Sequence, residues 1–127
     1  MGLPAAKQGD QIVAMDIHII LAPPTPPKPT PHPFTGILDS QLSADVKIMG
    51  LAAAVQGSTA SNTPPHIPIG GAFQTPPQNK GEIITGSATV KINGKPAARA
   101  TDTAKTCNDP VDLPSGQVLA AGTVLIG

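Results

Sequence analysis

The sequence predicts an all-β fold of short strands, arranged as three similar units around an axis. Three observations support this: alternating apolar segments, many turn residues and an internal repeat. The 127 residues include 16 prolines and 13 glycines, so turns and extended segments should dominate, and we find no amphipathic helix pattern. The apolar residues are mostly Ala, Val, Ile and Leu, which suit thin sheet layers. We expect one domain over residues 1–127, without an effector extension.

The clearest strand candidate is QIVAMDIHIIL, residues 11–21. Its alternation puts Val13, Met15 and Ile17 on one face and Asp16 and His18 on the other. Shorter strand candidates are residues 44–49, 82–85, 88–93, 118–120 and 123–126.

A proline-rich run, APPTPPKPTPHP, covers residues 22–33. Because proline has no N–H, we expect this run to lack a regular β-ladder and to be polyproline-II-like. It could be a ligand for an SH3-type domain, but we favour a stiff connector that carries His32 to the tip of the molecule.

A repeat organises the chain. VKIMGLAAAVQGSTASN (46–62) matches VKINGKPAARATDTAKT (90–106), and GLPAAKQGD (2–10) matches GLAAAVQGS (50–58). The third copy lacks its leading strand, but the chain ends in TVLIG, which supplies one. The alternative is coincidence among Ala and Gly residues. We favour three units around an axis, with the two termini adjacent and sharing the third unit.

The only imidazoles and thiol belong to His18, His32, His66 and Cys107. His18 follows Asp10 at the same distance as His66 follows Ser58, so the two histidines hold equivalent places in two units. Cys107 lies in the corresponding loop of the third. Three such positions near an axis, with His32 added, predict a His3Cys zinc site where the units taper together.

Simpler interpretations remain open at this stage. A histidine in a proline-rich loop is usually solvated, and a lone cysteine is often a small buried hydrophobe. Asp16 could accept a hydrogen bond from a ligand imidazole, but we favour a charge at a strand edge.

Other functions find little support in the sequence. We find no HExxH, GxSxG or phosphate-loop motif, and a nucleophilic Cys107–His pair lacks an oxyanion site, so we expect no enzyme. Eight basic and eight acidic residues balance, which argues against nucleic acid as a partner. The sequence has no apolar run long enough for a transmembrane helix and no signal peptide at its start. We therefore expect synthesis in the cytoplasm.

At Pro96-Ala97-Ala98-Arg99, within VKINGKPAAR, the chain resembles the PAAR-repeat proteins. Further similar segments are GLPAAKQGD, PHPFTG, NTPPHIPIGG, GSATVKING and CNDP. The resemblance implies a sharp, three-sided β-cone with one structural Zn2+ near its apex. It implies His18, His32, His66 and Cys107 as the ligands. The other two copies of the motif depart from it, since residues 51–55 lack the Pro and Arg and Lys7 replaces the Arg.

The resemblance also implies a function. Such proteins cap and sharpen the trimeric VgrG-type spike of type VI secretion systems and related contractile injection systems. They aid membrane puncture and often attach effector proteins. We expect a monomer on its own, a spike trimer as partner, transient contact with a target membrane, and delivery out of the producing cell. The alternative is a cytosolic adaptor that binds partners through the polyproline run.

Overall fold

The computed structural model describes residues 2–127, and in this range the chain is all-β, as predicted. The described residues contain no helical segment that could span a bilayer. The strands are β1 (Leu3–Pro4), β2 (Gln11–Ala22), β3 (Thr25–Ser40), β4 (Lys47–Ile48), β5 (Leu51–Ala52), β6 (Thr59–Asn62), β7 (Ala72–Phe73), β8 (Lys80–Ile83), β9 (Lys91–Ile92), β10 (Lys95–Pro96), β11 (Thr103–Thr106), β12 (Leu113–Leu119) and β13 (Leu125–Ile126).

The main sheet closes on itself. Its strand order is β12-β11-β8-β6-β3-β2-β7, and β12 also pairs with β2. The pairs β2/β3, β6/β8 and β11/β12 therefore form a small closed barrel, with β7 added to β2 beyond it. Closure removes the exposed edges that an open sheet would present.

One aromatic ring fills much of this narrow barrel. Phe34 is 1% exposed and packs with Ile12, Leu38 and Ile83, all of which are fully buried. The neighbouring position on β3 must be small: a Cβ on Gly36 would lie 2.7 Å from the Phe34 ring. Because the rest of the core consists of small and aliphatic side chains, a single phenylalanine suffices to fill the barrel.

Three two-stranded antiparallel ribbons lie at one end of the molecule, which we call the base. They are β4–β5, β9–β10 and β1–β13, and the last joins the two ends of the chain. Their central isoleucines, Ile48, Ile92 and Ile126, are 6%, 8% and 6% exposed. This near-identity confirms the predicted three units, with the third shared between the termini.

A ring of backbone hydrogen bonds joins the three units beside the base. The Ala6 N–H donates to the Ala98 carbonyl (3.0 Å), the Ala98 N–H to the Ala54 carbonyl (3.1 Å), and the Ala54 N–H to the Ala6 carbonyl (3.0 Å). All three side chains are fully buried. The repeated Ala-Ala pairs therefore allow three backbones to meet around the axis, because larger side chains would not fit.

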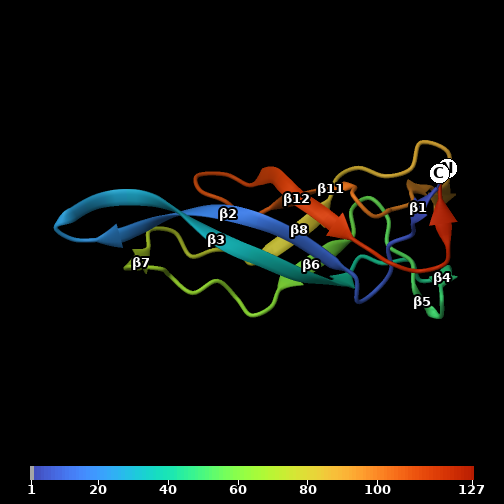
Figure 1. Ribbon diagram of the computed structural model, residues 1–127, viewed down its shortest axis with the longest axis horizontal. Coiled ribbons are helices and arrows are strands. Elements are labelled where there is room, and N and C mark those ends of the chain that lie inside the picture. The colour runs from blue at the N-terminus through green and yellow to red at the C-terminus, as the bar shows by residue number, and fades with distance from the viewer. Residues whose placement is uncertain (1) are drawn as a thin grey trace.

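The molecule is elongated. Figure 1 shows both termini at one end, together with β1, β4 and β5, and the turn between β2 and β3 at the opposite end, near β7. The long β2–β3 hairpin therefore spans from the barrel to the narrow tip.

The prediction for the proline-rich run was wrong. Residues 25–33 are part of β3, which pairs with β2 in antiparallel register, with Thr30 opposite His18 and Pro31 opposite Ile17. From Pro27 to Pro33 the prolines occupy alternate positions. The Ile17 and Ile19 N–H groups point away from β3, toward Asn108 and Asp109. The rows containing Pro29, Pro31 and Pro33 are thus the rows without ladder hydrogen bonds, where a missing N–H costs nothing.

Most other strand predictions are confirmed with shifted boundaries. Residues 11–21 form β2, and the shorter candidates overlap β4, β8, β9, β12 and β13. Sequence patterns missed β1, β5, β6, β7, β10 and β11. All but β6 and β11 are only two residues long, and β6 and β11 consist of small and polar residues without a hydrophobic alternation.

Candidate functional site

Three elements bring the histidines and the cysteine together above the barrel. His18 lies on β2, His66 on the loop after β6, and Cys107 directly after β11. Each of these elements belongs to a different strand pair of the barrel. The fold therefore places three side chains that could bind a metal ion near one point.

The donor atoms form a compact group. One donor atom each from Asp16, His18, His66 and Cys107 lie within 4.8 Å of one another. The His18 Nε2 is 3.8 Å from the Cys107 Sγ, and the His18 and His66 ring centres are 4.9 Å apart. Asp16, His18 and Cys107 are 0%, 1% and 3% exposed. The group is thus almost entirely removed from solvent.

Asp16 is a central member of this group, and its assignment to a strand edge was wrong. Its Oδ2 lies 2.8 Å from the His66 Nε2 and accepts a hydrogen bond from the Cys107 Sγ at 3.3 Å. Its Oδ1 accepts from the Thr106 hydroxyl and, at 3.5 Å, from the Asn108 amide. The alternation in residues 11–21 already placed Asp16 on the face of His18. What it could not reveal is that this face points inward.

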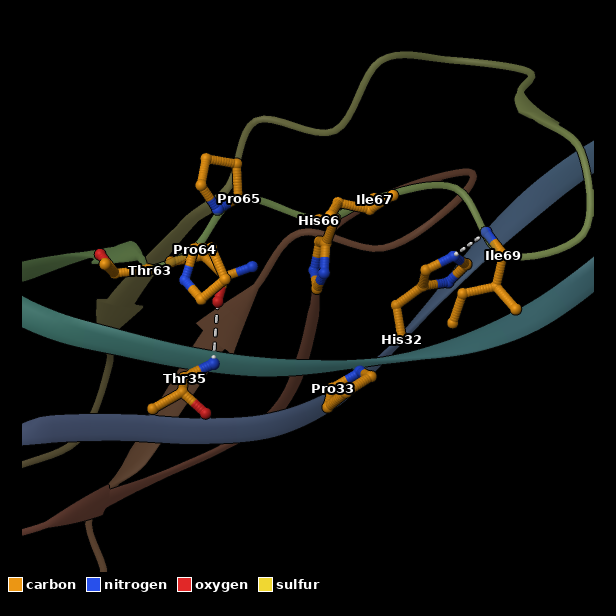
Figure 2. Close-up of a pocket in the computed structure, with 10 residues that line it drawn as sticks. His32, Pro33, Thr35, Thr63, Pro64, Pro65, His66, Ile67 and Ile69 are labelled. Carbon is orange, nitrogen blue, oxygen red and sulfur yellow. Dashed lines mark hydrogen bonds between the residues drawn. The ribbon is translucent and has the colours of Figure 1, made fainter.

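His32 lies beside the group. Its ring centre is 5.7 Å from that of His66, but its nitrogens contact the backbone. Nδ1 lies 2.9 Å from the Thr30 carbonyl, and Nε2 accepts from the Ile69 N–H at 3.3 Å. His32 and His66 line a pocket of about 340 Å³, together with Ile67 and Ile69 (Figure 2). The role of His32 as a metal ligand stays a prediction.

Burial sets the protonation of the group. Desolvation raises the pKa of the Cys107 thiol to about 12, and the Asp16 carboxylate adds to this effect. Desolvation also lowers the pKa of His18 below 6.5, against an opposing contribution from Asp109. His18 is therefore a neutral imidazole near pH 7, which is the form that binds metals. The thiol loses its proton readily only when a positive charge is placed beside it.

The residues present fit a metal ion. Two imidazoles, a thiol and a carboxylate are the donors that tetrahedral transition-metal sites use in proteins. In addition, the buried Nδ1 of His18 has no hydrogen-bond partner among the described residues. Its nearest acid, Asp109, lies 3.6 Å away, on the side where an outer carboxylate would orient a ligating imidazole. The group could therefore hold a metal ion.

Sequence reasoning missed the residues that support the group. The Asn108 side chain binds the Ile17 N–H at 2.6 Å and the Thr106 carbonyl at 3.1 Å. Thr106 is fully buried. Both residues flank Cys107, and CNDP was recognised only as a motif segment.

The base carries a second surface of interest. Val46, Val90 and Val124 occupy equivalent positions in the three units and are 37%, 37% and 39% exposed. Leu51 and Leu3 lie close by on β5 and β1 and are 42% and 36% exposed. An exposed valine is therefore repeated three times at the end opposite the narrow tip, whereas the position of Leu3 and Leu51 holds Lys95 in the other unit.

Comparison with known protein families gives a match for the second part of the chain. A family model described as the PAAR motif matches residues 74–127. No curated protein matches the chain. The matched segment contains the hairpin β9–β10 and Cys107, whereas His18, His32 and His66 lie before it. The equivalence of the first two units therefore depends on the geometry described above.

Proposed function

Because a family model of the PAAR motif matches residues 74–127, we propose that this chain is a structural spike tip that caps the trimeric VgrG-type spike of a type VI secretion system or related contractile injection system. In this role it sharpens the spike for membrane puncture and offers effector proteins a place of attachment. It is made in the cytoplasm and leaves the cell with the injection apparatus. The function needs no catalysis.

The near-threefold base carries this proposal. A single chain can cap a threefold trimer efficiently only if it presents the same surface three times. Here the three two-stranded ribbons of the base give the single chain a pseudo-threefold surface, which matches the threefold symmetry of a trimer. Val46, Val90 and Val124 would each meet one subunit of the spike, and their similar exposure means that each can bury a similar apolar area.

The second part of the proposal is a metal centre toward the narrow tip, the end of the molecule opposite the base. The proposed ligands are His18, His66 and Cys107 from the compact group, together with His32, which would exchange its contact with the Ile69 N–H for the metal. A Zn2+ ion there would tie the β2–β3 hairpin to the loops after β6 and β11. The chain has few large side chains to pack these loops, and a structural zinc ion contributes on the order of ten kcal/mol to folding in small domains. The metal would thus stiffen the tip.

Binding to the spike is the primary test. Purified protein mixed with its co-encoded spike trimer should give a complex of one chain per trimer by size-exclusion chromatography and mass photometry. Val90→Glu should weaken binding at least about tenfold, because the new charge must be desolvated on docking. Met15→Glu is a matched control, since Met15 is 55% exposed but lies on β2, away from the base. A complex that tolerates glutamate at Val46, Val90 and Val124 alike would refute docking through the base.

Metal content is the second test. Elemental mass spectrometry of the untagged protein should find about one zinc per chain. The substitutions His66→Ala and Cys107→Ala should remove the zinc and lower the melting temperature, and His18→Ala and His32→Ala should do the same. Full zinc occupancy in Cys107→Ala would contradict the ligand assignment.

A further inference from the structure

Asp16 is a buried carboxylate that the proposed ligand set leaves unexplained. It is fully buried, and a carboxylate at such a site is unfavourable unless a charge or strong donors compensate it. Its contacts divide by oxygen atom. The Thr106 hydroxyl and the Asn108 amide hold Oδ1, while Oδ2 faces the His66 Nε2 at 2.8 Å and the Cys107 Sγ at 3.3 Å.

The supporting contacts fix this orientation. Asn108 is itself held by the Ile17 N–H (2.6 Å) and the Thr106 carbonyl (3.1 Å), so Oδ1 is bound to a side chain that the backbone fixes. Oδ2 is left to contact His66 and Cys107, two donors of the metal group.

The position of Asp16 bears on the net charge of a metal-loaded centre. A divalent cation bound by neutral imidazoles and one thiolate leaves one net positive charge. The surrounding side chains are almost fully buried, with His18 at 1% and Cys107 at 3% exposure, so solvent cannot screen that charge. Two carboxylates lie beside the proposed ligands. Asp109, 3.6 Å from the His18 Nδ1, has a side chain that is 10% exposed and so partly screened by solvent, whereas Asp16 is fully buried against His66 and Cys107 and is the anion that would make the centre neutral.

We propose that Asp16 is the charge-balancing member of the metal centre, which makes the site selective for a divalent over a monovalent cation. The inference rests on the metal centre in the proposed function, and it holds whether or not His32 completes the coordination. Asp16 acts through its negative charge, because its Oδ2 lies beside the donor atoms of His66 and Cys107.

The test compares Asp16→Asn with the full-length wild-type protein, using two metals of different charge. Zn2+ affinity is measured by competition with a chromophoric chelator, and Cu+ affinity anaerobically by competition with bicinchoninate. Thiolate and imidazole donors suit both ions. With asparagine, Zn2+ affinity should fall about 10–100-fold, whereas Cu+, whose charge the thiolate alone balances, should bind at least as tightly as in wild type.

The comparison separates a charge effect from general damage. Equal losses for both metals would mean that Asp16 only supports the structure, and an unchanged Zn2+ affinity would mean that its charge is not used. Either result would overturn the proposal. Asp102→Asn is the control: it removes another buried carboxylate, 5% exposed and paired with Arg99 at the base, and should leave both affinities unchanged.

Two further outcomes are distinguishable. If wild-type protein binds neither metal, the proposed metal centre itself fails, independently of Asp16. If Asp16→Asn does not fold, infrared difference spectra of Asp109→Asn protein labelled with 13C-aspartate replace it, because Asp109 is the other carboxylate beside a proposed ligand, 3.6 Å from the His18 Nδ1. A carboxylate band that differs between the Zn2+-loaded and Cu+-loaded protein supports the proposal, and identical carboxylate bands overturn it.

Discussion

The buried thiol of Cys107 should make the metal-free protein less stable as pH rises. Burial and the Asp16 carboxylate raise its pKa from an ordinary value of 9.0 to about 12 in the folded state. Between these two values the folded protein keeps a proton that the unfolded chain loses. The stabilising contribution of the neutral thiol is therefore complete below pH 9.0 and is lost as pH rises toward 12.

The magnitude follows from the interval between the two values. Each pH unit in it removes about 1.4 kcal/mol of the free energy of unfolding. Raising the pH from 9 to 10.5 should therefore cost about 2 kcal/mol, out of a total stability that is typically about 5–15 kcal/mol for a domain. The chain contains no tyrosine, so no phenol titrates in this window.

The assay is urea denaturation in the presence of a strong chelator, at pH values from 7.5 to 10.5. Cys107→Ser is the control, because the hydroxyl is similar in size and does not titrate. The wild-type free energy of unfolding should fall more steeply than that of the variant above pH 9. Parallel curves for the two proteins would refute the view that a neutral buried thiol stabilises the metal-free fold.

Three further predictions concern the barrel, a base turn and the proline ladder. Phe34→Ala should lower the free energy of unfolding by about 3–5 kcal/mol, because the narrow core cannot refill around the cavity; a loss below 1 kcal/mol in thermal or urea unfolding would contradict this packing. Met49→Asn should stabilise the protein by about 1 kcal/mol, because Met49 has φ 52° and the equivalent Asn93 has φ 53°, a region that asparagine tolerates better; a lower melting temperature would count against this. Thr30→Pro should remove a ladder N–H and cost about 3 kcal/mol, whereas Pro31→Val should change stability by less than 1 kcal/mol; similar losses in both variants would show that the register argument is wrong.

The candidate site was partly predictable. The repeat frame identified His18 and His66 as equivalent positions and placed Cys107 in roughly the corresponding loop of the third unit. Such positions in symmetric units meet near the axis. The repeat frame could not predict the role of Asp16, because that role depends on which face of β2 points inward. It also could not predict that Thr106 and Asn108 hold the Asp16 carboxylate. His32 was expected from its residue type and the family resemblance, but its ring nitrogens contact the backbone at Thr30 and Ile69.

The all-β class, the three units and the joining of the two termini follow from the amino-acid pattern alone, because periodic apolar residues, turn residues and repeats can be read without knowing which strands pair. The closure of the barrel through β12 and β2 and the pairing of the proline-rich run with β2 are visible only in the folded chain. A proline forbids a ladder hydrogen bond only where its nitrogen faces a partner strand. The register of the strand pairing decides which way each proline nitrogen faces, and residue composition alone does not.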